Sequence, residues 1–131
     1  MTLQSTALHW IKLWHLIGAL MVGFIIYTSL APHPILPMTQ KWSDKLYHFT
    51  GYFGVMAWYA QFVKQRFVTM VLLVVLGVSL EFAQLLVNTR SFEWADMLAN
   101  ILGVILATMI VRGVLVQLLT YFENRCLKLF E

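Results

Sequence analysis

The chain has 131 residues, of which 60% are hydrophobic and only 11% are charged. A soluble domain of this length needs more polar residues to cover its surface, so the composition excludes most soluble enzymes and binding domains. Nine Lys and Arg residues stand against six Asp and Glu residues. In so apolar a chain, this basic excess indicates the cytoplasmic connectors of a membrane protein, and we expect no nucleic-acid partner.

Four apolar stretches come close to the roughly 20 residues that a transmembrane helix needs. They cover approximately residues 13–31, 46–63, 67–87 and 95–111. The connectors between them are short, so residues 1–131 are predicted to form a single all-α domain, a polytopic membrane protein with a four-transmembrane-helix bundle. Residues 1–12 and the tail 113–131 are amphipathic, and we expect both to lie at the membrane surface.

The first stretch resembles a signal peptide in one respect, because it ends in the small residues Ser29-Leu30-Ala31. Pro32 follows directly, and this is a poor context for the signal peptidase. We therefore expect the stretch to be a retained helix.

Basic residues divide unequally between the two sides of such a bundle. The N-terminus, the second connector and the tail hold Lys12, Lys64, Arg66, Arg112, Arg125 and Lys128. The first and third connectors hold Lys41, Lys45 and Arg90. The positive-inside rule then predicts that both termini are cytoplasmic. Cys126 is the only cysteine, so no internal disulfide is expected, and a reducing compartment suits it.

Polar side chains recur at helical spacing on one face of each of the last three stretches. These faces hold Asp44, His48 and Tyr52, then Gly77, Glu81, Gln84 and Asn88, then Asp96, Asn100 and Gly103. A charge near the bilayer centre costs about 2.5–3.5 kcal/mol, and lipid cannot solvate it. We therefore expect the three faces to turn towards one another and to enclose a polar pocket open to the outside. Ala99, Gly103 and Ala107 form a small-residue face that lets another helix approach closely.

Most of these residues also have simpler roles when taken singly. His48 fits a hydrogen-bonded core histidine, and Gln84 and Asn100 fit ordinary hydrogen bonds between helices. Glu81 resists such an account, because a carboxylate at that depth is protonated, paired with a cation or used in function.

The charged residues near the helix ends have simple roles of their own. Asp44 and Lys45 fit a solvated ion pair, and Asp96 complements the positive N-terminal end of its helix. Arg90 fits a partner for the nearby Glu93.

The chain resembles the VanZ-like family of small membrane proteins over about residues 41–107. The resemblance rests on an ordered set of short motifs: Asp44-Lys45-x-x-His48 with Tyr52, Glu81-x-x-Gln84, Arg90, Asp96, Asn100 and Gly103. It implies a bacterial cytoplasmic (inner) membrane protein with a role in the cell envelope. The family's namesake is linked to teicoplanin resistance, but the resemblance does not imply that this chain confers resistance.

A binding function is the first hypothesis. The pocket would hold an amphiphile from the outer leaflet, such as a cell-wall lipid precursor or the acyl tail of a lipoglycopeptide, and Lys41, Lys45 and Arg90 would meet an anionic head group. The expected ligand-binding residues are Asp44, Lys45, His48, Tyr52, Glu81, Gln84, Arg90, Asp96 and Asn100.

Two other hypotheses stay open. An intramembrane enzyme would act on a lipid-linked substrate with Glu81, His48 and Asp96 as its catalytic residues. The chain lacks an HExxH motif and a nucleophile in a recognisable setting, so we expect neither a metal nor a cofactor and do not favour an enzyme. Alternatively, the polar residues lock the helices in register, and the protein works through a partner. Four short helices enclose little volume, which leaves a homodimer open.

Overall fold

In the computed structural model, the described residues are 8–37, 40, 42–112 and 117–129, and they form helices joined by short connectors. The helices are α1 (Ile11–Leu30), α2 (Ser43–Tyr59), α3 (Arg66–Gln84), α4 (Trp94–Ile110) and α5 (Leu118–Leu127). No strand occurs in this part of the chain. The predicted all-α class is therefore confirmed.

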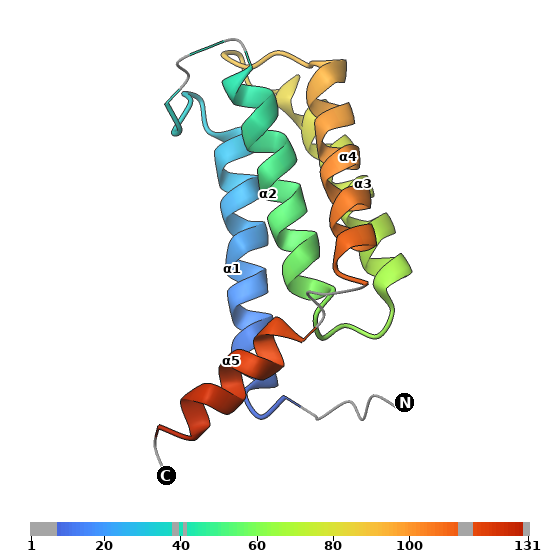
Figure 1. Ribbon diagram of the computed structural model, residues 1–131. Helices are drawn as coiled ribbons and strands as arrows, with labels where there is room; N and C mark the ends of the chain where they lie inside the picture. The colour runs from blue at the N-terminus through green and yellow to red at the C-terminus, as the bar shows by residue number, and fades with distance from the viewer. Residues whose placement is uncertain (1–7, 38–39, 41, 113–116, 130–131) are drawn as a thin grey trace.

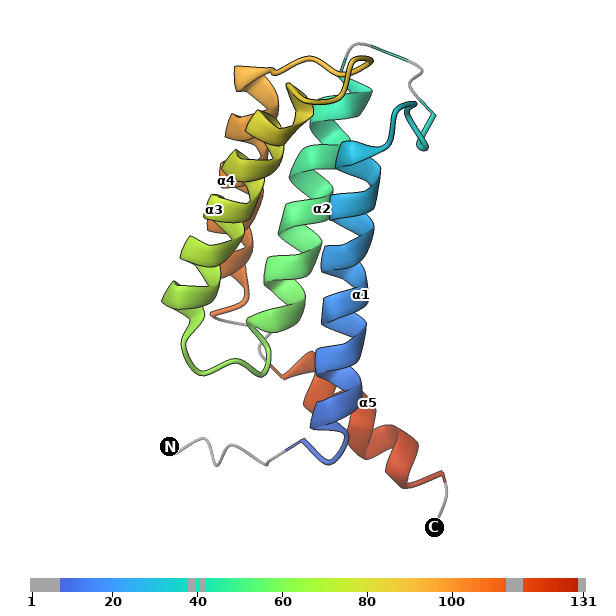
Figure 2. The ribbon, with the colours of Figure 1, turned by 180° about the vertical axis from the view of Figure 1, so that it is seen from behind.

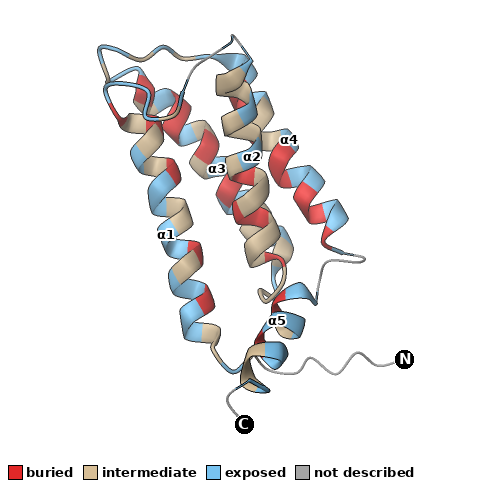
Figure 3. Ribbon diagram, turned by 60° about the vertical axis from the view of Figure 1, so that its left-hand side comes forward, coloured by how far each residue is buried: buried red, intermediate tan, exposed pale blue. Residues whose placement is uncertain are grey.

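The first four helices run side by side as a bundle, and α5 crosses below the start of α1 (Figure 1). Helices α2 and α3 each pack against the other three helices of the bundle, and the largest contact is between α2 and α4. The α1–α2 and α3–α4 connectors lie together at one end of the bundle, which we call the connector end (Figures 1 and 2). The α2–α3 connector lies at the opposite end, next to α5. Buried residues gather on the sides of the helices that face one another (Figure 3).

Two helices end earlier than the apolar stretches from which they were predicted. Helix α2 stops at Tyr59 instead of residue 63, and α3 stops at Gln84 instead of residue 87. After α3, the backbone N–H groups of Leu85 and Leu86 bond carbonyls three residues back, the spacing of a 3₁₀ turn. Hydropathy does not distinguish the α-helix from the turn that follows it, because Leu85 and Leu86 continue the apolar stretch into the turn.

By length and apolar composition, two of the described helices, α1 and α3, qualify as membrane spans. Helix α4 is apolar but has only 17 residues, and α2 also has 17 residues and carries more polar side chains. The predicted four-span arrangement therefore stays a prediction.

The closest approach in the core is between α2 and α4. A Cβ atom added to Gly103 would lie only 2.4 Å from the carbonyl oxygen of Phe49. The predicted small-residue face thus packs on α2, where Val104 and Ala107 are fully buried beside Met56. This contact fixes the two helices whose polar faces carry most of the candidate site residues.

Helix α5 is attached to the start of α1 through Glu123. This carboxylate is 3% exposed and accepts hydrogen bonds from the backbone N–H groups of His9 and Trp10. It also accepts one from the indole N–H of Trp14 at 2.7 Å. A negative charge is favourable at a helix N-terminus, where backbone N–H groups lack partners. The tail was expected to be a surface helix, and α5 does expose Tyr121, but its Glu123 face packs against the bundle.

Parts of the predicted terminal segments lie outside the described residues, namely 1–7, 113–116 and 130–131. Lys41, a predicted head-group contact, also lies outside them.

Substitution of Gly103 by Ala tests the close packing of α2 and α4. The added methyl group meets backbone, which cannot rotate away, so we expect a loss of about 1–3 kcal/mol and a lower melting temperature in detergent. Gly23→Ala is the matched control, because a Cβ there meets nothing within 4 Å. Equal melting temperatures for the two variants would contradict this packing.

Candidate functional site

A network of charged groups joins α2 to the start of α4 at the connector end. The ammonium group of Lys45 lies 2.5 Å from a carboxylate oxygen of Glu93 and 2.9 Å from Oδ1 of Asp96. Asp96 is only 2% exposed, so Lys45 compensates a carboxylate that water hardly reaches. Lys45 therefore pairs across two helices and not with its neighbour Asp44, as the simpler account of the sequence had it.

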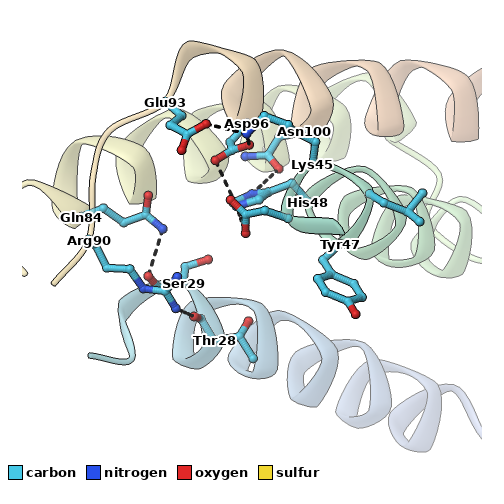
Figure 4. A network of polar contacts seen from close by, with 12 residues as sticks. Thr28, Ser29, Lys45, Tyr47, His48, Gln84, Arg90, Glu93, Asp96 and Asn100 are labelled. Atoms are coloured by element: carbon cyan, nitrogen blue, oxygen red, sulfur yellow. Dashed lines mark hydrogen bonds and ion pairs between the residues drawn. The ribbon is translucent and has the colours of Figure 1, made fainter. Parts of the chain in front are cut away.

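His48 occupies the centre of this network (Figure 4). Its Nδ1 lies 3.0 Å from Oδ1 of Asn100 on α4 and 3.7 Å from Oε1 of Glu81 on α3. Its Nε2 lies 3.8 Å from a carboxylate oxygen of Asp44 and 3.8 Å from Oδ2 of Asp96. The imidazole thus contacts polar groups from three helices.

Two buried polar atoms beside the network have no hydrogen-bond partner among the described residues. They are Oε2 of Glu81 and the hydroxyl oxygen of Tyr52. Glu81 is 1% exposed and Tyr52 is 2% exposed. An unpaired buried polar group is costly, so native proteins retain few of them, and those few are often functional.

A second polar group lies where α3 meets the end of α1 (Figure 4). Arg90 donates from Nε to the carbonyl of Ala31 and from Nη2 to that of Thr28, both at 3.0 Å. Gln84 donates to the carbonyl of Ser29 at 3.0 Å. These donors satisfy carbonyls that the last turn of α1 leaves without partners. Arg90 therefore bonds α1 and does not serve as the partner of Glu93.

Between these two groups lies a cavity of about 270 Å³. Its apolar side is formed by Phe24 and Ile25 on α1 and by Ile35 and Leu36 in the α1–α2 connector. Its polar lining comprises Thr28, Ser29, Asp44, Tyr47, His48, Thr50, Tyr52, Gln84 and Arg90. One cavity thus presents both an apolar wall and groups of either charge.

The structure divides the nine predicted site residues into two sets. Asp44, His48, Tyr52, Gln84 and Arg90 line the cavity. Lys45, Glu81, Asp96 and Asn100 are absent from its lining and lie with His48 in the contacts between α2, α3 and α4. The predicted meeting of the three polar faces is therefore observed in part, because Glu81, Asp96 and Asn100 surround His48. Gln84 bonds α1 instead, and Asn88 is exposed beyond the end of α3.

The contribution of α1 to the cavity was not foreseen. Its residues Phe24, Ile25, Thr28 and Ser29 carry no charge, and hydroxyl groups in an apolar stretch commonly bond the preceding turn, as Thr28 does. The role of Glu93 was missed as well. A pattern within single helices could not reveal either, because both depend on contacts between elements distant in sequence.

One set of side chains at the edge of the cavity has the composition of a metal site. Asp44, His48 and Asp96 each offer one ligand atom, and these atoms lie within 4.8 Å of one another. Imidazole and carboxylate donors suit divalent ions of the first transition row.

Replacement of Arg90 by Gln tests its role in holding the end of α1. The change removes charged hydrogen bonds to the carbonyls of Thr28 and Ala31, each worth about 1.5–3 kcal/mol, so we expect a clearly lower melting temperature in detergent. Arg125→Gln, at an exposed position on α5, is the charge-matched control. An unchanged melting temperature for Arg90→Gln would show that these bonds contribute nothing to stability.

A known family covers most of the chain. The model of the family described as VanZ/LLP1 matches residues 4–118, which cover α1 to α4. No curated protein and no solved structure matches the chain. Because the match extends over most of the sequence, the chain belongs to the VanZ/LLP1 family.

Proposed function

We propose that this protein spans the bacterial inner membrane four times and binds an amphiphile with an anionic head group in the cavity between α1, α2 and the α1–α2 connector. The head group meets Arg90 and its polar neighbours, and the acyl chain lies along Phe24, Ile25, Ile35 and Leu36. The proposal rests on one observation, namely that a single cavity has both a polar end and an apolar wall.

The four-span arrangement is supported by the surface of the bundle. Large apolar side chains are exposed along α1, α3 and α4. Soluble proteins rarely expose so wide an apolar surface to water. The exposed side chains include Leu16, Leu20, Phe67, Leu72, Leu98, Leu102 and Met109. Exposed Trp42 and Trp94 stand at the connector-end tips of α2 and α4, where interfacial aromatics are common. Seventeen residues are also enough for a short span.

The orientation of the proposal follows from the basic residues. Lys64 and Arg66 lie at the α2–α3 connector, Arg112 follows the end of α4, and Arg125 lies on α5. These segments are at the end of the bundle opposite to the cavity (Figure 1). The positive-inside rule assigns that end to the cytoplasm. The connector end and its cavity then face the outer leaflet.

The class of ligand follows from the lining and the family. Arg suits phosphate and carboxylate groups, and an apolar wall suits an acyl chain. A cell-wall lipid precursor and the acyl tail of a lipoglycopeptide both combine these features with an envelope location. A contribution to teicoplanin resistance would follow from the second ligand.

A structural lock is the second candidate, and the bond between His48 and Asn100 favours it. A buried bond between α2 and α4 can fix the register of the two helices without binding any ligand. The two candidates differ in what a cavity-filling substitution does, because it blocks a ligand but leaves this bond in place.

Substitution of Gly51 by Leu tests ligand binding directly. Gly51 lines the cavity, and a Cβ atom there makes only ordinary contacts with Ile25 at 3.6 Å, so a Leu side chain is expected to fill the cavity without displacing a helix. Native mass spectrometry in mild detergent should show one defined envelope lipid on the wild type. We expect at least a tenfold loss of this lipid in Gly51→Leu.

Gly23→Leu serves as the matched control, because Gly23 is exposed on α1 and does not line the cavity. It should retain the lipid. If all three proteins carry the same bulk lipids, the binding proposal is wrong and the structural lock is favoured.

The orientation is tested by labelling single cysteines with a membrane-impermeant maleimide. In a Cys126→Ser background, His33→Cys in the α1–α2 connector, at an exposed position that does not line the cavity, should be labelled while the inner membrane is intact. Lys64→Cys in the α2–α3 connector should be labelled only after the inner membrane is permeabilised. The reverse pattern would overturn the proposed orientation.

A further inference from the structure

The two ring nitrogens of His48 face different surroundings. Nδ1 lies 3.0 Å from Asn100 Oδ1, and an amide oxygen can only accept, so Nδ1 carries the proton. In the neutral imidazole Nε2 then presents a lone pair. When a histidine binds a metal through one ring nitrogen, the other nitrogen usually donates its N–H to an oxygen acceptor in this way.

Nε2 faces two further acceptors. A carboxylate oxygen of Asp44 and Oδ2 of Asp96 each lie 3.8 Å from it. Lys45 bonds the other oxygen of Asp96, Oδ1, at 2.9 Å, so Oδ2 remains directed towards the imidazole. Three atoms with lone pairs, namely Nε2 and the two carboxylate oxygens, thus converge on one point at the edge of the cavity.

The negative charge of the surrounding carboxylates also favours a bound cation. Asp44, Glu81, Glu93 and Asp96 bring four carboxylates to this network, and within the described residues Lys45 pairs with two of them, Glu93 and Asp96. Glu81 is 1% exposed, its Oε1 lies 3.7 Å from Nδ1 of His48, and its Oε2 has no partner in the described part of the chain. This buried oxygen without a partner is an observation independent of the three converging atoms.

We propose that Asp44, His48 and Asp96 bind a divalent metal ion of the first transition row through one oxygen of each carboxylate and Nε2 of the imidazole. Asn100 positions the imidazole from the other side, and Lys45 positions Asp96. Because Asp44 and His48 line the cavity, the remaining coordination positions of the ion are open to the anionic group of a ligand there.

The observed spacing suits such an ion. Bonds of about 2.0–2.2 Å in a tetrahedral site place ligand atoms roughly 3.3–3.5 Å apart. The two separations of 3.8 Å need a contraction of a few tenths of an ångström, which small side-chain rotations supply. The donor set of one nitrogen and two oxygens favours Zn²⁺ or Mn²⁺.

Equilibrium dialysis of the full chain in detergent tests the site with the metal alone, so its result does not depend on any amphiphile. The protein is first stripped with a chelator, then dialysed against Zn²⁺ or Mn²⁺, and the bound metal is measured by mass spectrometry. We expect one ion per wild-type chain at saturation. His48→Gln and Asp96→Asn should each raise the Kd at least tenfold.

A control variant addresses non-specific binding. His15→Gln removes an exposed imidazole on α1. It should bind the ion with the wild-type Kd. The absence of a saturable ion on the wild type would overturn the proposal. An unchanged Kd in folded His48→Gln would overturn it as well.

X-ray absorption of the zinc-loaded wild type keeps the proposal testable if the variants fail to fold. The spectrum should show nitrogen and oxygen ligands, including imidazole, with a Zn–N distance of about 2.0–2.1 Å. Sulfur in the coordination shell would contradict the assignment.

Discussion

The structure depends on one constraint, namely that the polar groups of an apolar bundle must find their partners within the bundle. At the connector end, His48 of α2 contacts Glu81 of α3 and Asp96 and Asn100 of α4. These contacts require α2 and α4 to lie close together, and Gly103 permits it by bringing its Cα against the backbone at Phe49. The close packing at the small residue and the polar contacts therefore depend on each other.

This constraint explains where the cavity lies. Because α2 and α4 are in close contact, little space remains between their polar faces. The cavity lies instead on the other side of α2, against α1, whose end is held by Arg90 and Gln84. His48 and Asp44 reach both sides, since they touch the buried network and also line the cavity. Part of the polar lining of the cavity therefore belongs to the network that also joins the helices.

The sequence allowed the all-α class and the approximate positions of the helices to be predicted, because long apolar stretches and helical spacing are local properties. It also identified the polar residues of α2, α3 and α4, since charges such as Glu81 are conspicuous in an apolar helix. Helix ends at Tyr59 and Gln84 were missed, because apolar residues continue into the turns.

The partners of the charged residues were not predictable by the same means. Lys45 pairs with Glu93 and Asp96, Arg90 bonds α1 carbonyls, and Glu123 accepts N–H groups at the start of α1. Each of these contacts joins segments that are distant in the chain. Helical spacing carries no information about which helix lies opposite, so the wall that α1 contributes to the cavity emerged only from the packing.

Photo-cross-linking in living cells tests most directly whether the cavity holds a specific amphiphile. A benzophenone side chain is introduced at Phe24, which lines the cavity, or at Phe67, which is exposed on α3 outside it. After irradiation, the attached lipids are identified by mass spectrometry. The account predicts one defined envelope amphiphile at position 24 and mixed bulk lipids at position 67. The same bulk lipids at both positions would contradict it.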